Sequence, residues 1–178
     1  MRSLRFIPVL AFLLACDAAA DTRKEERPLL KEGEQAPDLV GEAADGTKVR
    51  LSEQKGHPAV VYFYPKDATP GCTIEACAFR DAFDRYQQAK ITVFGVSSDS
   101  AESHRAFRKQ HQLPFPLVAD EDGRVQHSYG VRSNLGMAER VTFLIGPAGE
   151  VAHVWPDVDP GIHANEVLTR AAALTAAP

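Results

Sequence analysis

The stretch AVVYFYPKDATPGCTIEACAFRD, residues 59–81, contains the two patterns that decide the fold. Its first six residues are an uninterrupted run of apolar, β-branched and aromatic side chains, which is typical of a strand buried on both faces. Pro65 ends this run. Thr69 is a favourable N-cap and Pro70 a favourable first helical residue, so a helix is predicted over 70–89. The stretch therefore predicts a strand that leads through a short loop into a helix.

Strands and helices continue to alternate along the rest of the chain. A hairpin is predicted around Asp45-Gly46, because this dipeptide favours a tight turn between two strands. The spacing of apolar residues predicts further strands at 91–97, 115–119, 141–145 and 151–155, and helices at 100–111 and 163–174. This order indicates one α/β domain over residues 34–178, with helices flanking a central mixed β-sheet.

The composition fits one globular domain and argues against several classes of protein. The chain has 178 residues, of which 44% are hydrophobic and 25% charged, values close to the average for soluble proteins. A net charge of −4 argues against nucleic-acid binding, which needs a basic surface to displace phosphate counterions. Three cysteines are too few for a scaffold held together by disulfides.

The N-terminus is typical of an export signal. Arg2 and Arg5 precede a ten-residue apolar run at 6–15, which is too short to span a bilayer but suits a signal peptide. Leu-Leu-Ala before Cys16 is similar to a bacterial lipobox, so the preferred interpretation is a signal at residues 1–16 that ends in a lipidated Cys16.

Plain signal cleavage is the alternative. The run Ala18-Ala19-Ala20 is a small-residue cleavage site, which would make residues 1–20 the signal. Residues 17–33 are polar and charged and are predicted to be a flexible tether. We therefore expect an exported protein, held on the periplasmic side of the inner membrane as a lipoprotein or soluble in the periplasm.

Two cysteines lie within the predicted helix at 70–89. Counting from Thr69, Cys72 falls at the third helical position, where unpaired backbone N–H groups and the helix dipole favour a thiolate over a thiol. Cys77 follows five residues later, about 140° around an ideal helix. Their sulfurs then point apart, so a disulfide would require the first helical turns to unwind. From spacing alone, Cys77 could equally be a core residue.

A metal site is not expected. The two cysteines could supply two ligands, but no second pair of cysteines or histidines lies at ligand spacing. His104 and His111 are seven residues apart on a polar helix and are expected to be exposed to solvent. His57, His127, His153 and His163 are scattered along the chain.

The motif Pro65-x-x-x-Thr69-x-x-Cys72 resembles the active-site motif of peroxiredoxins. The longer run at 62–81 is similar to the bacterioferritin comigratory protein (peroxiredoxin Q) subfamily. The resemblance extends over about residues 30–175, the whole predicted domain. Further matching segments lie at 95–99, 114–120, 129–131 and 140–145.

This resemblance implies a thioredoxin-like fold and a peroxidase that uses no metal, haem or flavin cofactor. It makes Cys72 the peroxidatic cysteine and Cys77 the resolving cysteine. It implies that Thr69 orients thiolate and peroxide, that Pro65 shields the site from water, and that the Arg140 guanidinium stabilises the thiolate and the transition state. Without the resemblance, Arg140 is only a charge beside a strand.

The resemblance also implies the partners of the protein. The expected substrates are hydrogen peroxide and small organic hydroperoxides, and the expected reductant is thioredoxin or an exported thioredoxin-like protein, because the export signal sets this chain apart from cytoplasmic family members. We expect a monomer. Two alternatives remain: an exported dithiol–disulfide oxidoreductase acting through Cys72 and Cys77, and a redox-sensing lipoprotein without enzymatic activity.

Overall fold

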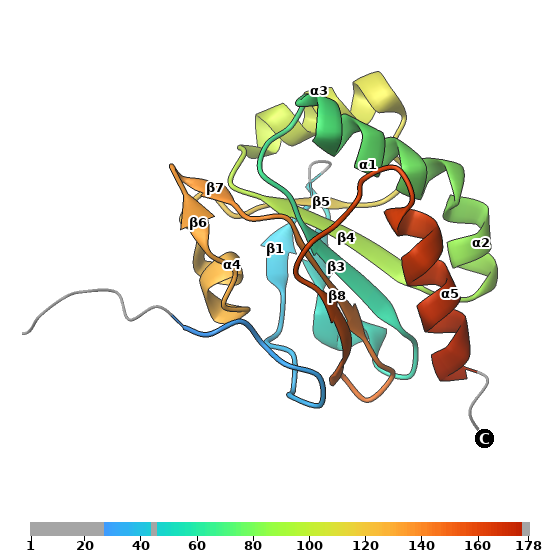
Figure 1. Ribbon diagram of the computed structural model, residues 1–178. Helices are drawn as coiled ribbons and strands as arrows, with labels where there is room; N and C mark the ends of the chain where they lie inside the picture. Colours follow the sequence, from blue (N-terminus) through green and yellow to red (C-terminus); the bar gives the residue numbers. More distant parts are fainter. Residues whose placement is uncertain (1–26, 44–45, 176–178) are drawn as a thin grey trace, which may run out of the picture.

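The computed structural model describes residues 27–43 and 46–175. The predicted signal peptide and Cys16 lie outside this part of the chain, as does Asp45 of the predicted turn. A five-stranded sheet in the order β5-β4-β3-β8-β9 forms the centre of the molecule (Figure 1). The sheet strands are β3 (Ala59–Phe63), β4 (Thr92–Ser97), β5 (Leu117–Ala119), β8 (Val141–Ile145) and β9 (Val151–Trp155).

The sheet is mixed, as predicted. Strands β3, β4 and β5 run parallel, whereas β8 runs antiparallel to both β3 and β9. All five residues of β3 are buried, because helices or loops cover both faces of this central strand. The side chains of Val60 and Tyr62 belong to one core cluster and those of Val61 and Phe63 to the other.

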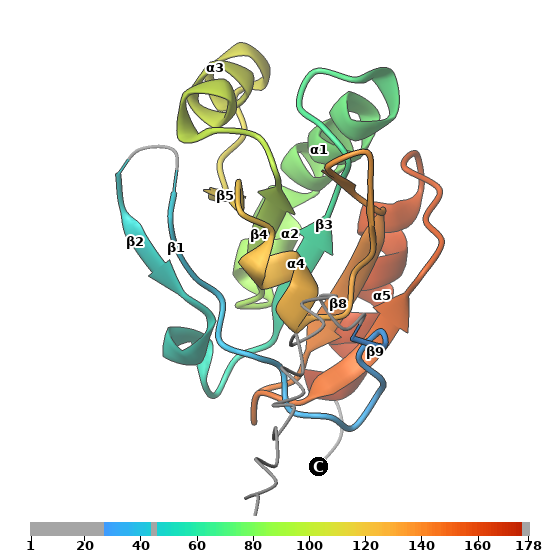
Figure 2. The same cartoon turned by 90° about the vertical axis from the view of Figure 1, so that its left-hand side faces the viewer.

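Four helices contribute to the core on the Tyr62 side of the sheet: α1 (Pro70–Asp81), α2 (Phe83–Gln88), α3 (Ala101–His111) and α5 (His163–Thr175). The other face is covered by α4 (Arg124–Ser128) and by N-terminal segments. Figures 1 and 2 show α4 on one side of the sheet and α2 and α5 on the other. This layering is the α/β arrangement that the sequence predicted, and it agrees with the thioredoxin-like fold that the family resemblance implied.

The predicted hairpin near the N-terminus is confirmed. Strands β1 (Val40–Glu42) and β2 (Lys48–Arg50) pair antiparallel, and a short 3-10 helix, η1 (Leu51–Gln54), follows. The domain also extends further toward the N-terminus than residue 34. Leu30, in the segment predicted to be a tether, is buried, and its N–H donates to the carbonyl of Tyr129.

Three local features differ from the sequence prediction. The single helix expected over 70–89 is broken at Ala82, where the backbone leaves helical geometry between α1 and α2. Helix α4 was not predicted. A small hairpin of β6 (Ser133–Asn134) and β7 (Met137–Ala138) was also missed. Among the described residues, no helix has the length and apolar character needed to cross a membrane.

Candidate functional site

The predicted position of Cys72 in the first turn of α1 is confirmed. Thr69 is the extended N-cap residue and Pro70 begins the helix, so Cys72 is the third helical residue. Its thiol is buried, with 2% of the residue accessible to solvent. The Thr69 side chain does not cap the helix. Its hydroxyl instead donates to the carbonyl of Lys66 at 3.0 Å, which leaves helix N–H groups near Cys72 without a side-chain cap.

Arg140 contacts Cys72 although the two residues lie 68 positions apart in the sequence. Its Nη2 donates to the Cys72 sulfur at 3.2 Å. The residue after it, Val141, pairs with Phe63 across the sheet, and this pairing places Arg140 beside the end of the strand that leads to Cys72. The backbone at Gly71 also passes close to this side chain, since a Cβ there would lie 3.4 Å from the Arg140 Nη2. The sheet therefore brings together the two residues that the family motif implied.

Glu75 completes this group and was not found from the sequence. Its carboxylate accepts from Arg140 Nη1, and the residue is fully buried. Burial raises the pKa of Glu75 to about 7, although the Arg140 charge acts in the opposite direction. The sequence did contain a signal: Glu75 lies three residues after Cys72, so both side chains project from one face of the helix.

Arg140 remains a cation between these two groups. Burial would lower the pKa of Arg140, but the adjacent Glu75 and Cys72 side chains raise it. The guanidinium can therefore stabilise negative charge on the Cys72 sulfur by both a hydrogen bond and direct Coulombic attraction.

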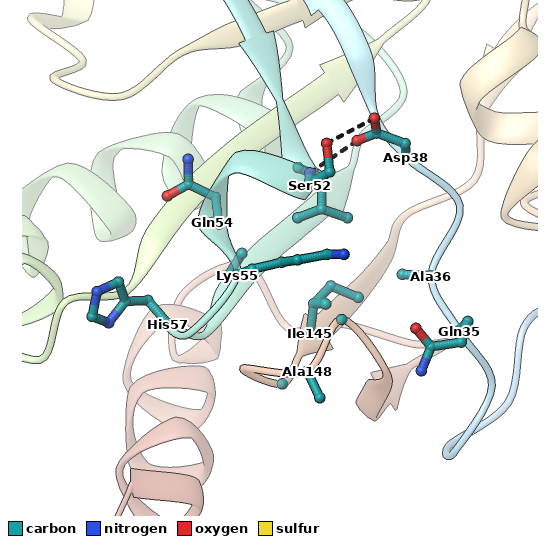
Figure 3. A pocket seen from close by; sticks show the side chains of 13 residues that line it. Gln35, Ala36, Asp38, Ser52, Gln54, Lys55, His57, Ile145 and Ala148 are labelled. Atoms are coloured by element: carbon teal, nitrogen blue, oxygen red, sulfur yellow. Dashed lines mark hydrogen bonds between the residues drawn. The ribbon is translucent and has the colours of Figure 1, made fainter.

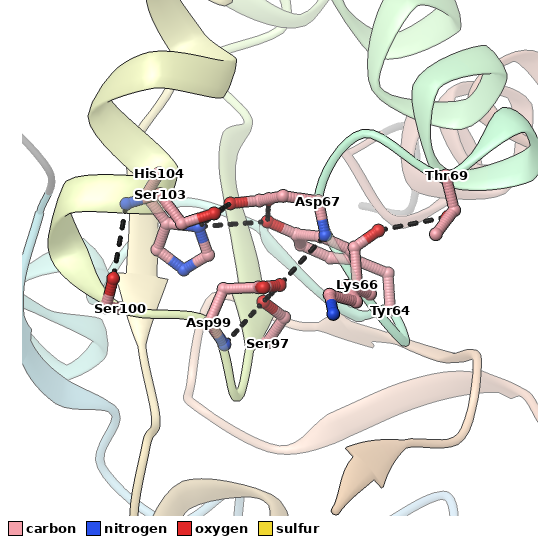
Figure 4. Close-up of polar contacts among 9 residues, drawn as sticks. All are labelled: Tyr64, Lys66, Asp67, Thr69, Ser97, Asp99, Ser100, Ser103 and His104. Carbon is pink, nitrogen blue, oxygen red and sulfur yellow. Dashed lines mark hydrogen bonds and ion pairs between the residues drawn. The ribbon is translucent and has the colours of Figure 1, made fainter.

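A buried polar cluster centred on Asp67 holds the loop between Pro65 and Thr69 (Figure 4). The Asp67 carboxylate contacts the Tyr64 hydroxyl at 2.8 Å, the Ser103 hydroxyl at 2.7 Å and the His104 Nδ1 at 2.9 Å. Burial opposes ionisation, but the hydrogen bonds and the His104 imidazole outweigh it and lower the pKa of Asp67. Asp67 thus fastens the loop to helix α3.

The backbone of this loop is fixed as well. The Asp67 N–H donates to Asp99 Oδ2 at 2.8 Å, and the Ser97 hydroxyl donates to the same oxygen at 2.7 Å. Ala68 adopts a φ of 57°, a left-handed conformation that an alanine rarely accepts. The cluster therefore fixes the loop between half-buried Pro65 and Thr69, which leads directly into the helix that carries Cys72.

The expectation that His104 is exposed was wrong. The residue is fully buried, because it faces Asp67 in the loop between Pro65 and Thr69. Sequence periodicity could not reveal this, since the partner that stabilises its burial lies 37 residues away. His111, the other histidine of this helix, is half-buried.

Cys77 lies further along α1. Both Cys72 and Cys77 are free thiols, and Cys77 is half-buried. The intact helix over Pro70–Asp81 keeps the two residues at the spacing that the sequence predicted. A bond between them would therefore require local unwinding of α1.

A separate hollow lies at the opposite end of β3. It has a volume of about 200 Å³ and is bordered by Gln35, Asp38, Lys55 and His57, among others (Figure 3). Because none of the residues around Cys72 lines it, this hollow is not part of the candidate site.

Comparison with known proteins supports the same family as the sequence motif. The AhpC/TSA family matches residues 33–154. The chain is 41% identical over 143 residues to peroxiredoxin Bcp of Bacillus subtilis, covering 76% of this chain and 91% of that protein. It is 41% identical over 142 residues to the chloroplastic peroxiredoxin Q of Triticum aestivum, covering 78% of this chain but 65% of that longer protein.

A solved structure agrees in fold. The bacterioferritin comigratory protein of Xanthomonas campestris, whose alkyl peroxide reduction activity was examined in trapped intermediate and ligand complexes, superposes with a TM-score of 0.74. The two are 34% identical, and the match covers 80% of this chain and 98% of that one. The chain therefore belongs to the AhpC/TSA family and, within it, to the Bcp/peroxiredoxin Q group of peroxiredoxins, which are thiol peroxidases.

Proposed function

We propose that this protein reduces hydrogen peroxide and small organic hydroperoxides through the thiolate of Cys72, which Cys77 then resolves as an intramolecular disulfide. The contact of 3.2 Å between Arg140 Nη2 and the Cys72 sulfur carries this proposal. A cation held against a buried thiol at a helix N-terminus favours the thiolate, and the thiolate is the nucleophile.

In the first step the Cys72 thiolate attacks one peroxide oxygen, and the O–O bond breaks. Cys72 becomes a sulfenic acid, and the other oxygen leaves as water or an alcohol after taking up a proton. Arg140 and the helix N–H groups are placed to stabilise charge that develops on the peroxide oxygens. The Thr69 hydroxyl orients the peroxide, and Pro65 limits access of water.

In the second step the Cys77 sulfur, after losing its proton, attacks the sulfenic acid, and water leaves as the disulfide forms. This step requires α1 to unwind, because the folded helix keeps the sulfurs apart. A thioredoxin-like dithiol protein then reduces the disulfide by exchange. The alternative of a dithiol–disulfide oxidoreductase is not favoured, because Cys72 lies in the motif Pro65-x-x-x-Thr69-x-x-Cys72, which is typical of peroxidases of this family.

Trp155 offers a direct test, because it is the only tryptophan of the chain. Its ring packs edge-on against His163 at 5.3 Å, and His163 packs against Phe79 of α1 at 5.9 Å. Unwinding of α1 should therefore change its fluorescence. We would oxidise the reduced protein with one equivalent of hydrogen peroxide, follow Trp155 by stopped flow, and identify the product by mass spectrometry.

The expected product is a chain that has lost two hydrogens. Cys77→Ser should instead gain one oxygen on Cys72, and Cys72→Ser should not react rapidly. A reaction no faster than that of a free thiol would refute the peroxidase proposal. Rapid sulfenic acid formation without an intramolecular disulfide would refute only the role of Cys77.

Export is a separate proposal that rests on the N-terminal sequence. We propose that the chain is exported and retained by lipidation of Cys16, with plain cleavage after Ala20 as the alternative. Mass spectrometry of the N-terminus of protein from membrane and soluble fractions distinguishes the two. A chain that retains Met1–Ala15 in the cytoplasm would refute both. Sedimentation of the reduced protein tests the proposal that it is a monomer.

A further inference from the structure

The side chain of Cys77 lies beside polar groups of helix α3 that take no part in the oxidation of Cys72 by peroxide. Its sulfur lies 3.9 Å from Nδ1 of His111, the last residue of α3. The His111 ring is held in place by edge-on packing against Phe107, with centroids 4.9 Å apart. An imidazole nitrogen in this position can accept a proton from the thiol when the ring proton is on Nε2.

Arg80 connects helix α1, which carries Cys77, to the end of helix α3 at His111. Its Nη1 donates to the His111 carbonyl at 2.9 Å, and its guanidinium pairs with Asp81 at 2.8 Å. The Asp81 hydrogen bond and the nearby Cys77 raise the pKa of Arg80. Arg80 and Asp81 of α1 thus place a charged pair beside Cys77 and His111.

These contacts divide α1 into two halves. The C-terminal half is fastened to α3 by Arg80, whereas in the N-terminal half Cys72 and Glu75 contact Arg140. A sulfenic acid carries less negative charge than a thiolate, so oxidation weakens the attraction between Cys72 and Arg140. The N-terminal half is thus the one expected to unwind, which brings oxidised Cys72 to a Cys77 that stays beside His111.

Disulfide formation needs Cys77 as a thiolate, because the thiolate is the nucleophile. An ordinary thiol with a pKa near 8.5 is only about 3% ionised at pH 7. We propose that His111 is the proton acceptor for Cys77 in the disulfide-forming step, an inference that rests on the proposed resolving role of Cys77.

The step balances without a further oxidant. His111 Nδ1 takes the proton from the Cys77 thiol, and the Cys77 sulfur attacks the Cys72 sulfur. The S–O bond of the sulfenic acid breaks, and its oxygen leaves as water after accepting the proton. The peroxide consumed in the first step has already supplied the oxidising equivalents.

The test uses His111→Phe, which keeps a ring against Phe107 but removes both nitrogens, in the otherwise complete protein. Lys109→Ala is the matched control, because it removes an exposed charge from the same helical turn. After a single pulse of hydrogen peroxide, the rates of Cys72 oxidation and of disulfide formation are measured separately between pH 6 and 9.

The expected result is that His111→Phe slows disulfide formation by about 10- to 30-fold at pH 7, the range set by the thiolate fraction of an unassisted thiol. Its rate should then rise about tenfold per pH unit and approach that of the wild type above pH 8.5. The rate of Cys72 oxidation should change little. With excess peroxide the variant should accumulate sulfinic acid at Cys72, because the sulfenic acid persists.

Two outcomes would overturn the inference. An unchanged rate of disulfide formation would show that His111 does not take the proton. A faster rate would show that the contact only restrains α1 in its folded form. His111→Gln, which keeps a polar side chain but cannot titrate, serves as the second variant if the phenylalanine disturbs folding, and it should be equally slow. In either case Cys77→Ser tests the resolving role independently.

Discussion

Replacing the buried Glu75 by glutamine should change how the stability of the protein depends on pH. A glutamate in an unfolded chain titrates near pH 4.5, whereas burial raises the pKa of folded Glu75 to about 7. Below pH 4.5 the carboxyl is neutral in both states. Between pH 4.5 and 7 the unfolded chain ionises while the folded protein keeps its proton, so the free energy of unfolding falls as pH rises.

The size of this effect follows from the difference between the two pKa values, which corresponds to about 3 kcal/mol. This would lower the melting temperature of a domain of this size by about 6–12 °C across the window. Glu75→Gln cannot titrate. The stability of this variant should therefore lack the slope that Glu75 gives the wild type between pH 4.5 and 7.

The assay is urea unfolding of the reduced protein, followed by Trp155 fluorescence between pH 4 and 8. The difference in unfolding free energy between wild type and Glu75→Gln should move by about 3 kcal/mol in favour of the variant as pH rises to 7. Exposed Glu121 provides the control, since Glu121→Gln should run parallel to the wild type. A flat difference for Glu75→Gln would refute the reasoning and show that Arg140 keeps Glu75 ionised throughout.

Three further substitutions test the rest of the site. Arg140→Met should slow Cys72 oxidation by about 10²–10³-fold, the usual loss when a donor to a developing charge is removed, as measured by stopped flow with hydrogen peroxide. Asp67→Asn should lower stability at neutral pH by about 1–3 kcal/mol, and this difference should shrink as pH falls through the lowered pKa of Asp67, where the wild type loses the same charge. Ala68→Gly should raise the melting temperature slightly, because glycine relieves about 1 kcal/mol of strain at a φ of 57°. A fall in melting temperature with Ala68→Gly would contradict the strain assigned to this residue.

Local signals explain what the sequence predicted correctly. The position of Cys72 followed from Thr69 and Pro70, which lie within three residues of it and set the start of the helix. The two-sided burial of β3 followed from its continuous apolar run. Such features depend on neighbouring residues, so a single chain is enough to predict them.

The features that were missed depend on distant partners or on weak local signals. Glu75 is paired with Arg140, which lies 65 residues away, and buried His104 is paired with Asp67, which lies 37 residues away. The break at Ala82 involves no glycine or proline, so no local signal marked it. Gly136 could have indicated the hairpin of β6 and β7, but its strands are two residues long and too short to show alternation.

The pairing of Phe63 with Val141 must form during folding before Arg140 can contact Cys72. Strands that are 78 positions apart must find the correct register before Arg140 can face Cys72, and a slip of one residue would turn the guanidinium to the opposite side of the sheet. Pairing between segments so distant in sequence is slow, because a long loop must close first. A newly made chain therefore carries Cys72 without the Arg140 cation beside it until β8 joins the sheet.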